Sequence, residues 1–247
     1  MHRMLSLAAA FAAALVVFSV PGSAQTLDDI VAMNLKSKGG LEKIRATQTV
    51  RMTGLVAARD PMGQEMKANM VILAKRPNLM RRETTVNGQS TVMAFDGKTF
   101  WMARGNTPPQ QLPGPQAAYA MQDAEFDSVF VDYKEKGYKI ALAGKETLGG
   151  KPVYHLKVTK KNGPTQDFYL DAQTGLEKKI SVSVAAPDRE PITFVTEMSD
   201  YREVDGRQIP FKTQQTQNNI AVSMVTLEKV EFNIPADESL FRMPLAK

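Results

Sequence analysis

The chain of 247 residues contains no cysteine, two histidines and a single tryptophan. The absence of cysteine excludes disulfide bonds and thiolate chemistry, so stability must come from packing and hydrogen bonds. Zinc sites are built from cysteine and histidine in pairs, and this sequence does not offer them. A P-loop, a G-x-G-x-x-G fingerprint and an aspartate-rich calcium loop are also missing. We therefore predict that the protein holds no metal and no cofactor.

The excess of positive over negative charge is small. Lys and Arg number 31 against 26 Asp and Glu, which gives a formal net charge of +5. The basic residues occur in short pairs such as Arg81-Arg82 and Lys178-Lys179, whereas nucleic-acid-binding proteins concentrate them on one face. Such pairs are typical of solvated turns and strand edges. We predict no nucleic-acid partner.

The first segment has the pattern of a secretory signal peptide. Arg3 precedes an apolar run from Leu5 to Val20, and small residues end at Ala24. A membrane anchor is the alternative, but the run is short for a bilayer span, which needs about 20 residues. We expect residues 1–24 to be removed, residues 25–247 to form a single domain, and the soluble product to be periplasmic.

His155 is the one histidine beyond this leader. In the run VYHLKV, strand alternation places it on the same face as Val153 and Lys157. A catalytic histidine needs a partner whose proton it takes and a third group to orient it. No G-x-S-x-G elbow is present, and nothing singles out the two acids of a glycosidase. We interpret His155 as a strand residue and the protein as non-catalytic; an envelope hydrolase remains a minor alternative.

Helical periodicity is confined to two places. Residues Leu27–Lys38 carry one apolar stripe behind a capping Thr26, with LEKIRA adding one more turn after Gly39-Gly40. A second helix is expected over Ala117–Lys136, after a Pro-rich segment at 107–115 that cannot form a regular element.

Elsewhere the apolar residues alternate with period two. Five runs between Thr49 and Arg104 are separated by turn signals such as Asn87-Gly88, the strongest local sign of a hairpin. Alternating runs resume at Tyr138, for a total of about twelve strands. A meandering sheet of that size accumulates twist and cannot stay flat. We predict a mainly β, α+β fold: a highly curved antiparallel sheet that forms an unclosed β-barrel, with the helices as a lid over its concave face.

Such a hollow favours apolar ligands. Methionine is unbranched and adapts to irregular partners, and each buried CH₂ of an acyl chain contributes about 0.8 kcal/mol. The candidate cavity residues are the methionines and aromatics of the predicted strands: Met52, Met70, Met93, Phe100, Trp101, Phe194 and Met224.

Three segments carry a resemblance to a known family. LKSKGGLEKIRATQTVRMTG, GKETLGGKPVYHLKVTKKNGPTQDFYLDAQTGLEKK and the ending FNIPADESLFRMP resemble the outer-membrane lipoprotein-sorting proteins, the LolA- and LolB-like lipid carriers. The resemblance implies an unclosed barrel with helices over an apolar cavity. In that family an arginine on an early strand holds the lid closed; Arg51 is the nearest match, and Arg81 or Arg82 would serve as well. The Pro-rich segment departs from the typical carriers.

These features favour a periplasmic, non-catalytic carrier of lipids or acylated lipoproteins. Its partners would be acyl chains and, by resemblance, transport components of the inner and outer membranes. The alternative is an envelope sensor, a regulatory protein-interaction module on the same fold.

Overall fold

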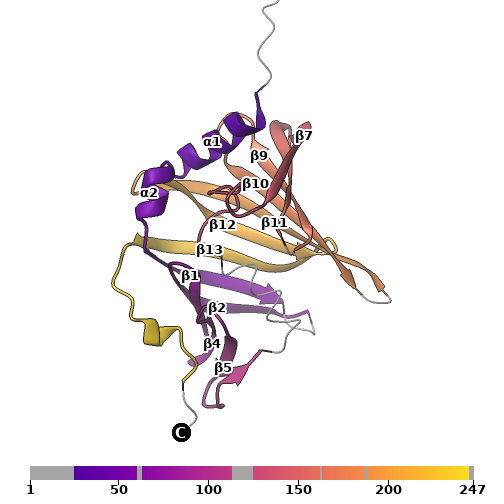
Figure 1. Cartoon of the computed structure of the whole chain (residues 1–247). Helices are drawn as coiled ribbons and strands as arrows, with labels where there is room; N and C mark the ends of the chain where they lie inside the picture. The colour runs from indigo at the N-terminus through magenta and orange to yellow at the C-terminus, as the bar shows by residue number, and fades with distance from the viewer. Residues whose placement is uncertain (1–24, 60–62, 113–124, 162, 187–188, 245–247) are drawn as a thin grey trace, which may run out of the picture.

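A computed structural model describes residues 25–59, 63–112, 125–161, 163–186 and 189–244. These residues form two α-helices, one short 3-10 helix and a single sheet of 13 strands (Figure 1). The elements are α1 (Leu27–Ser37), α2 (Leu41–Ala46), β1 (Thr49–Arg59), β2 (Glu65–Lys75), β3 (Leu79–Val86), β4 (Gln89–Phe95), β5 (Phe100–Arg104), β6 (Gln110–Gln111), β7 (Lys139–Leu148), β8 (Lys151–Thr159), β9 (Thr165–Asp171), β10 (Glu177–Ala186), β11 (Arg189–Val204), β12 (Arg207–Gln217), β13 (Ile220–Phe232) and η1 (Glu238–Leu240).

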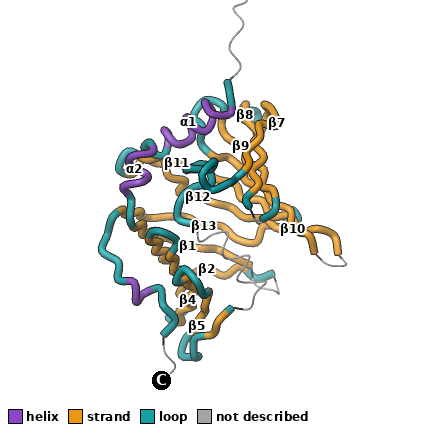
Figure 2. The backbone as a smooth tube through the Cα atoms, in the orientation of Figure 1, coloured by secondary structure: helices purple, strands orange, loops and turns teal. Residues whose placement is uncertain are grey.

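The sheet consists of two antiparallel meanders. One runs from β1 to β6 and the other from β7 to β13, and they join where β1 pairs with β13. Within the described residues β6 and β7 are the two outer strands and do not pair with each other. The prediction of a mainly β, unclosed antiparallel sheet is therefore confirmed. Figures 1 and 2 show α1 and α2 beside the second meander.

The turn signals in the sequence form the turns they predict. Asn87 and Gly88 both have positive φ, 49° and 79°, as a two-residue hairpin turn requires. All five strands expected between Thr49 and Arg104 are present. One difference is β6, a short strand inside the Pro-rich segment, which pairs with Trp101 and Met102.

Helix α1 begins and packs as its sequence predicts. Thr26 and Asp29 form a reciprocal capping box. Ile30 and Val31 are buried against β8 and β9, in a core with Leu156, Val158, Phe168 and Leu170. The buried Asn34 donates from Nδ2 to the carbonyl of Gly175, at 2.8 Å, in the turn between β9 and β10. This contact fixes α1 against the second meander.

The second predicted helix is wrong in its described part. Residues 125–128 are irregular, residues 129–137 form turns, and residues 117–124 lie outside the described residues. Val129, Phe130 and Val131 are all buried, and three consecutive side chains cannot share one face of a helix. Asp132 and Gly137 have positive φ, 50° and 71°, which also interrupts a helix. A lid of two helices is therefore not confirmed.

The two faces of the sheet are covered differently. Side chains alternate between them, and we call them the cavity face, which carries Val50, and the outer face. On the outer face the segment after β13 returns across the first meander. Phe241 is fully buried there, and its carbonyl accepts a hydrogen bond of 2.7 Å from Trp101 Nε1.

Gly54 marks a close approach between the two meanders. The β1–β13 register shifts between Thr53 and Gly54, because β13 has one extra residue there. A Cβ on Gly54 would lie 2.2 Å from the carbonyl oxygen of Thr226. Glycine inside a strand often marks such a backbone approach.

We expect Gly54→Ala to destabilise the protein by about 1–3 kcal/mol, because the added methyl must push two backbones apart. Urea unfolding followed by circular dichroism measures this loss. The matched control is Gly163→Ala, whose Cβ would meet only Lys160 Cβ at 3.7 Å. Equal stability of the two variants would contradict the close approach.

Candidate functional site

The curled sheet encloses a cavity of about 520 Å³ on its cavity face. Side chains of six adjacent strands, from β9 through β13 to β1, line this one cavity, which requires the sheet to bend around it. Helix α2 and the turn segment 125–131 complete the wall. The apolar lining residues are Ile44, Val50, Phe126, Val129, Val131, Phe168, Ile180, Val182, Phe194, Met198, Ile209, Pro210 and Phe232.

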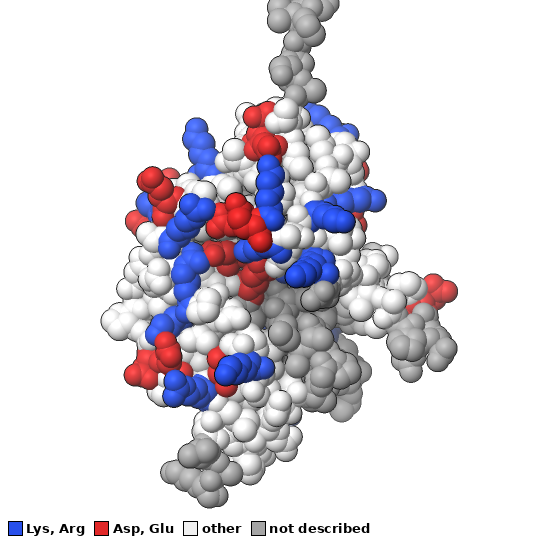
Figure 3. All heavy atoms as spheres, viewed as in Figure 1, with Lys and Arg blue, Asp and Glu red and all other residues white. Residues whose placement is uncertain are grey.

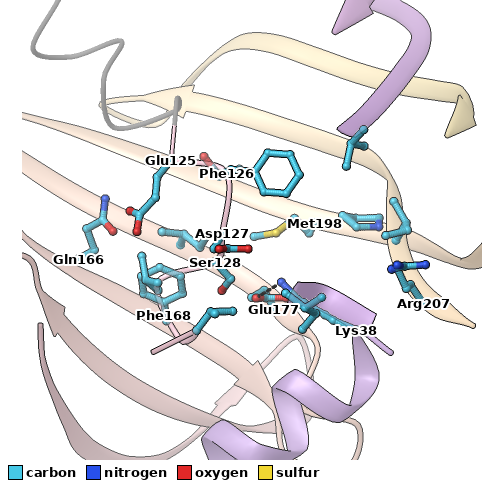
Figure 4. Close-up of a pocket in the computed structure, with 18 of the residues that line it drawn as sticks. Lys38, Glu125, Phe126, Asp127, Ser128, Gln166, Phe168, Glu177, Met198 and Arg207 are labelled. Carbon is cyan, nitrogen blue, oxygen red and sulfur yellow. Dashed lines mark hydrogen bonds and ion pairs between the residues drawn. The ribbon is translucent and has the colours of Figure 1, made fainter. Parts of the chain in front are cut away.

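Charged side chains line the same cavity in pairs. At the end of α1, Lys38 forms an ion pair of 2.5 Å with the buried Glu177 of β10, drawn as a dashed line in Figure 4. Figure 4 places Arg207 at one end of the cavity and Glu125 at the other. The wall is thus mainly apolar, and Lys38 and Glu177 neutralise each other within it.

Two arginines fasten α2 over the cavity. Arg207, buried at the start of β12, donates to the carbonyl of Lys43 at 3.2 Å and to Thr47 Oγ1 at 2.7 Å. Its guanidinium lies 4.1 Å from the ring centre of Phe232. The last carbonyls of a helix have no partner within the helix, so Arg207 satisfies one of them from the second meander.

Arg76 does the same from the first meander, at the turn between β2 and β3. It donates to the carbonyls of Ile44 at 2.8 Å and Thr47 at 2.6 Å. It also forms a bidentate pair with Asp127, at 2.5 and 2.7 Å, and lies over the ring of Phe126. A planar guanidinium suits such a fork. Arg76 therefore joins α2 to the turn segment that covers the cavity.

Glu125 is the centre of a second charged cluster. Its two oxygens accept hydrogen bonds of 2.7 Å from Lys136 and Lys160, and Tyr138 Oη donates to it at 3.2 Å. Partial burial on its own would raise the pKa of the Glu125 carboxyl, but the hydrogen bonds and charges of the two lysines outweigh burial and lower it.

Four of the candidate residues predicted from the sequence share the cavity face of the first meander. Met52, Met70, Met93 and Phe100 lie there, as the registers from β1 to β5 show. Every methionine in β1–β5 is on this face: Met52, Met66, Met70, Met80, Met93 and Met102. Phe194, in the second meander, lines the cavity itself.

The other candidates face away from the cavity. Trp101 is on the outer face under Phe241, and Met224 is 45% exposed there, opposite Ala57. Arg51 is also on the outer face, 3.5 Å from Glu231, and its described contacts do not include a helix. Arg76 and Arg207 make the helix contacts that were expected of Arg51.

The two alternatives to Arg51 lie on opposite faces of β3. Arg81 is on the outer face with Glu83, at 2.9 Å. Arg82 is exposed on the cavity face, between Ile72 and Met93 in the ladder. Neither has a described hydrogen bond or ion pair with α1 or α2, although Arg81 donates to the carbonyl of Leu240 in η1 at 3.3 Å.

His155 is a strand residue on the outer face of β8. Its Nδ1 and Nε2 atoms are each 2.7 Å from a carboxylate oxygen, of Glu146 and Asp167 respectively. Its ring stacks on Tyr169, with centroids 4.5 Å apart. These contacts link the side chains of β7, β8 and β9 on the face of the sheet away from the cavity.

Several cavity residues were missed by sequence reasoning. The alternation of Ile180 and Val182 in KKISVSVA was a usable signal for a strand with one apolar face. No local signal marks Arg76 or Glu125, because their partners are far away in the sequence.

Among the described residues, no helix is long and apolar enough to cross a membrane. The same residues contain no group of three His, Cys, Asp or Glu placed to hold a metal ion. On the face shown in Figure 3, Lys and Arg alternate with Asp and Glu around α1 and α2, so this face has no patch of a single sign.

We expect Arg76→Lys to cost about 2 kcal/mol of stability, since a lysine cannot replace the bidentate pair and both carbonyl contacts. Urea unfolding is the measurement. Arg242→Lys is the matched control, because its pair with Glu238 is 3.8 Å long and 71% of the arginine side chain is exposed. A loss no larger than that of the control would show that Arg76 does not fasten α2.

The lowered pKa of Glu125 has a consequence for the pH dependence of stability. The ion pairs contribute fully above the ordinary pKa of glutamate and are lost as the pH falls through the lower folded-state pKa. We expect Glu125→Gln to be less stable than the parent at neutral pH, with the difference shrinking in acid. Glu65→Gln, from an exposed pair with Lys67, should differ little from the parent at any pH. If the stability difference between Glu125→Gln and the parent grew in acid, the ion pairs of Glu125 would not be the source of that stability.

Similar folds are found among proteins of known structure. No protein-family model matches the sequence, and no curated protein sequence matches it. Solved structures do match. A LolA superfamily protein from Nitrosomonas europaea aligns with a TM-score of 0.62 at 12% identity, over 89% of this chain and 98% of that one. A DUF1329 family protein from Desulfovibrio piger aligns at 0.60 and 12% identity, over 87% and 96%.

A third similar structure comes from Vibrio parahaemolyticus and is described as an outer membrane lipoprotein-sorting protein domain. It aligns with a TM-score of 0.60 at 12% identity, over 86% of this chain and 94% of that one. The chain therefore has the LolA-like fold, and the family resemblance that the sequence indicated is confirmed at the level of the fold.

Proposed function

We propose that this chain is a non-catalytic carrier that binds lipids or acylated lipoproteins in the cavity of its unclosed sheet. The observation that supports the proposal is the cavity of about 520 Å³, whose wall consists mainly of apolar side chains. Small-molecule sites typically have volumes of about 300–1,000 Å³ and apolar linings. Acyl chains gain about 0.8 kcal/mol for each CH₂ that they bury, so this wall needs no polar motif to bind them.

The charged residues around the cavity favour binding over catalysis. Glu177 pairs with Lys38, and Asp127 pairs with Arg76, so both carboxylates are held in structural contacts. A general base would need to reach a substrate proton instead. The fold supports the same view, because one similar structure is described as a lipoprotein-sorting domain.

The methionine-rich face of the first meander extends the proposed binding surface. Val50 belongs both to the cavity wall and to the apolar cluster that contains Met52 and Met70. Phe194 lines the cavity and is assigned as a ligand contact. Met52, Met70, Met93 and Phe100 share its face of the sheet but are not among the residues that line the cavity, and we assign them as an extension of the contact surface. Methionine suits this role, since its flexible side chain repacks around irregular partners.

The proposal includes the route and the compartment. Residues 1–24 would direct export and be removed, and residues 25–247 would act as one domain in the periplasm. There the carrier would meet acylated cargo and the transport components of the two membranes.

We expect Met198→Glu to weaken binding of a fluorescent fatty-acid analogue by at least about ten-fold, because it puts a charge into an apolar wall. Met224→Glu, on the outer face, should leave binding unchanged. Fluorescence titration of the purified protein measures both, with native mass spectrometry after gentle extraction as a second readout. A clean apo mass together with no binding to the parent protein would refute the carrier. Capture of one protein partner, indifferent to lipid, would favour the regulatory module.

A further inference from the structure

A second, polar pocket of about 500 Å³ adjoins the apolar cavity. The two share Glu125 and Asp127 in their linings. The other residues of the polar pocket are Gln48, Arg76, Pro77 and Lys136. In Figure 4, Glu125, Phe126 and Asp127 follow one another along the segment that borders the cavity. An apolar space and a polar space therefore meet at Glu125 and Asp127, which line both.

Positive charge exceeds negative charge at this junction. Arg76 and Asp127 neutralise each other in a bidentate pair. Glu125 alone faces two lysines, Lys136 and Lys160, both at 2.7 Å. The cluster thus carries one cation more than it has carboxylates.

Lys160 has hydrogen-bonding capacity that its described contacts do not use. It lines the apolar cavity, and only 17% of its side chain is exposed. An ammonium group has three N–H donors. The described contacts of Lys160 are one hydrogen bond, to Glu125 Oε2, and the ring of Tyr138, whose centre is 5.9 Å away. A charged group removed from water is costly unless its donors find acceptors. An oxyanion in the cavity would supply them.

We propose that Lys160 and Lys136 form a binding site for the anionic headgroup of a single-chain amphiphile. Its acyl chain would occupy the apolar cavity, and its oxyanion would sit at the junction between the two pockets. This inference rests on the proposed carrier function and specifies its ligand class. A carboxylate and a phosphate share the required chemistry, since both present several acceptor oxygens to an ammonium group.

The size of the cavity agrees with a ligand of this kind. About 520 Å³ is within the range of sites that enclose one small molecule. Glu125 would position the two lysines before the ligand arrives, and the incoming oxyanion would use the donors that Glu125 leaves open.

The test is displacement of N-phenyl-1-naphthylamine from the purified protein by four ligands at low salt. Myristate and myristoyl-lysophosphatidylglycerol carry an anion, whereas myristyl alcohol and myristoyl-lysophosphatidylcholine do not carry a net negative charge. We expect at least one anionic ligand to bind about ten-fold more tightly than the alcohol, as one charged hydrogen bond allows. The preference should weaken as salt is added.

Variants of Lys160 locate the site. Lys160→Met should abolish the preference for the anion while myristyl alcohol still binds, and Lys160→Arg should keep it. Lys134→Met is the matched control, because Lys134 belongs to the same turn as Lys136 but is 66% exposed and pairs with Asp28. If Lys160→Met fails to fold, the comparison of Lys160→Arg and Lys136→Met with the parent gives the same information.

The outcomes separate the two proposals. Equal binding of acid and alcohol, or a preference that survives in both lysine variants, overturns the headgroup site and leaves the carrier intact. Failure of all four ligands to displace the probe overturns the carrier itself. Tight binding of myristate alone identifies a carboxylate headgroup, and tight binding of the lysophospholipid identifies a phosphate.

Discussion

The pairing of β1 with β13 is the contact on which the rest of the structure depends. It joins two meanders that would otherwise be separate sheets, and only a continuous sheet of this width curls far enough to enclose a cavity. The two strands are at opposite ends of the described chain, so this pairing is non-local and closes a long loop. The bulge beside Gly54 lets the backbones meet at that point and adds local twist.

Two arginines reinforce this joint from either side. Arg76 comes from the first meander and Arg207 from the second, and both donate to the end of α2. The helix is thereby bound to both halves of the sheet at one place, beside the cavity. Arginine suits this position because it stays charged when buried and presents several donors in a fixed fork. The guanidinium of Arg76 also binds Asp127. Arg76 therefore links the segment 125–131, which forms part of the cavity wall, to the first meander of the sheet.

The sequence allowed the strands to be predicted better than the site. Period-two alternation and positive-φ turns are local signals, and they located β1–β5 and α1 correctly. Alternation divides the side chains of each strand between two faces, but it cannot say which face becomes the inside. Trp101 and Met224 therefore turned out to lie on the outer face. The contacts of Arg76 with Asp127 and of Glu125 with Lys160 depend on tertiary packing, and the tight turns at 125–137 override a composition that favours helix.

The two outer strands of the described sheet, β6 and β7, bear on the volume that the sheet can enclose. In a closed barrel, strand number and stagger fix the diameter. Within the described residues no ladder links β6 to β7, so the walls can spread or tighten by small changes in twist while every inter-strand hydrogen bond is kept. The cavity can in this sense change its width while every pair of neighbouring strands stays hydrogen-bonded.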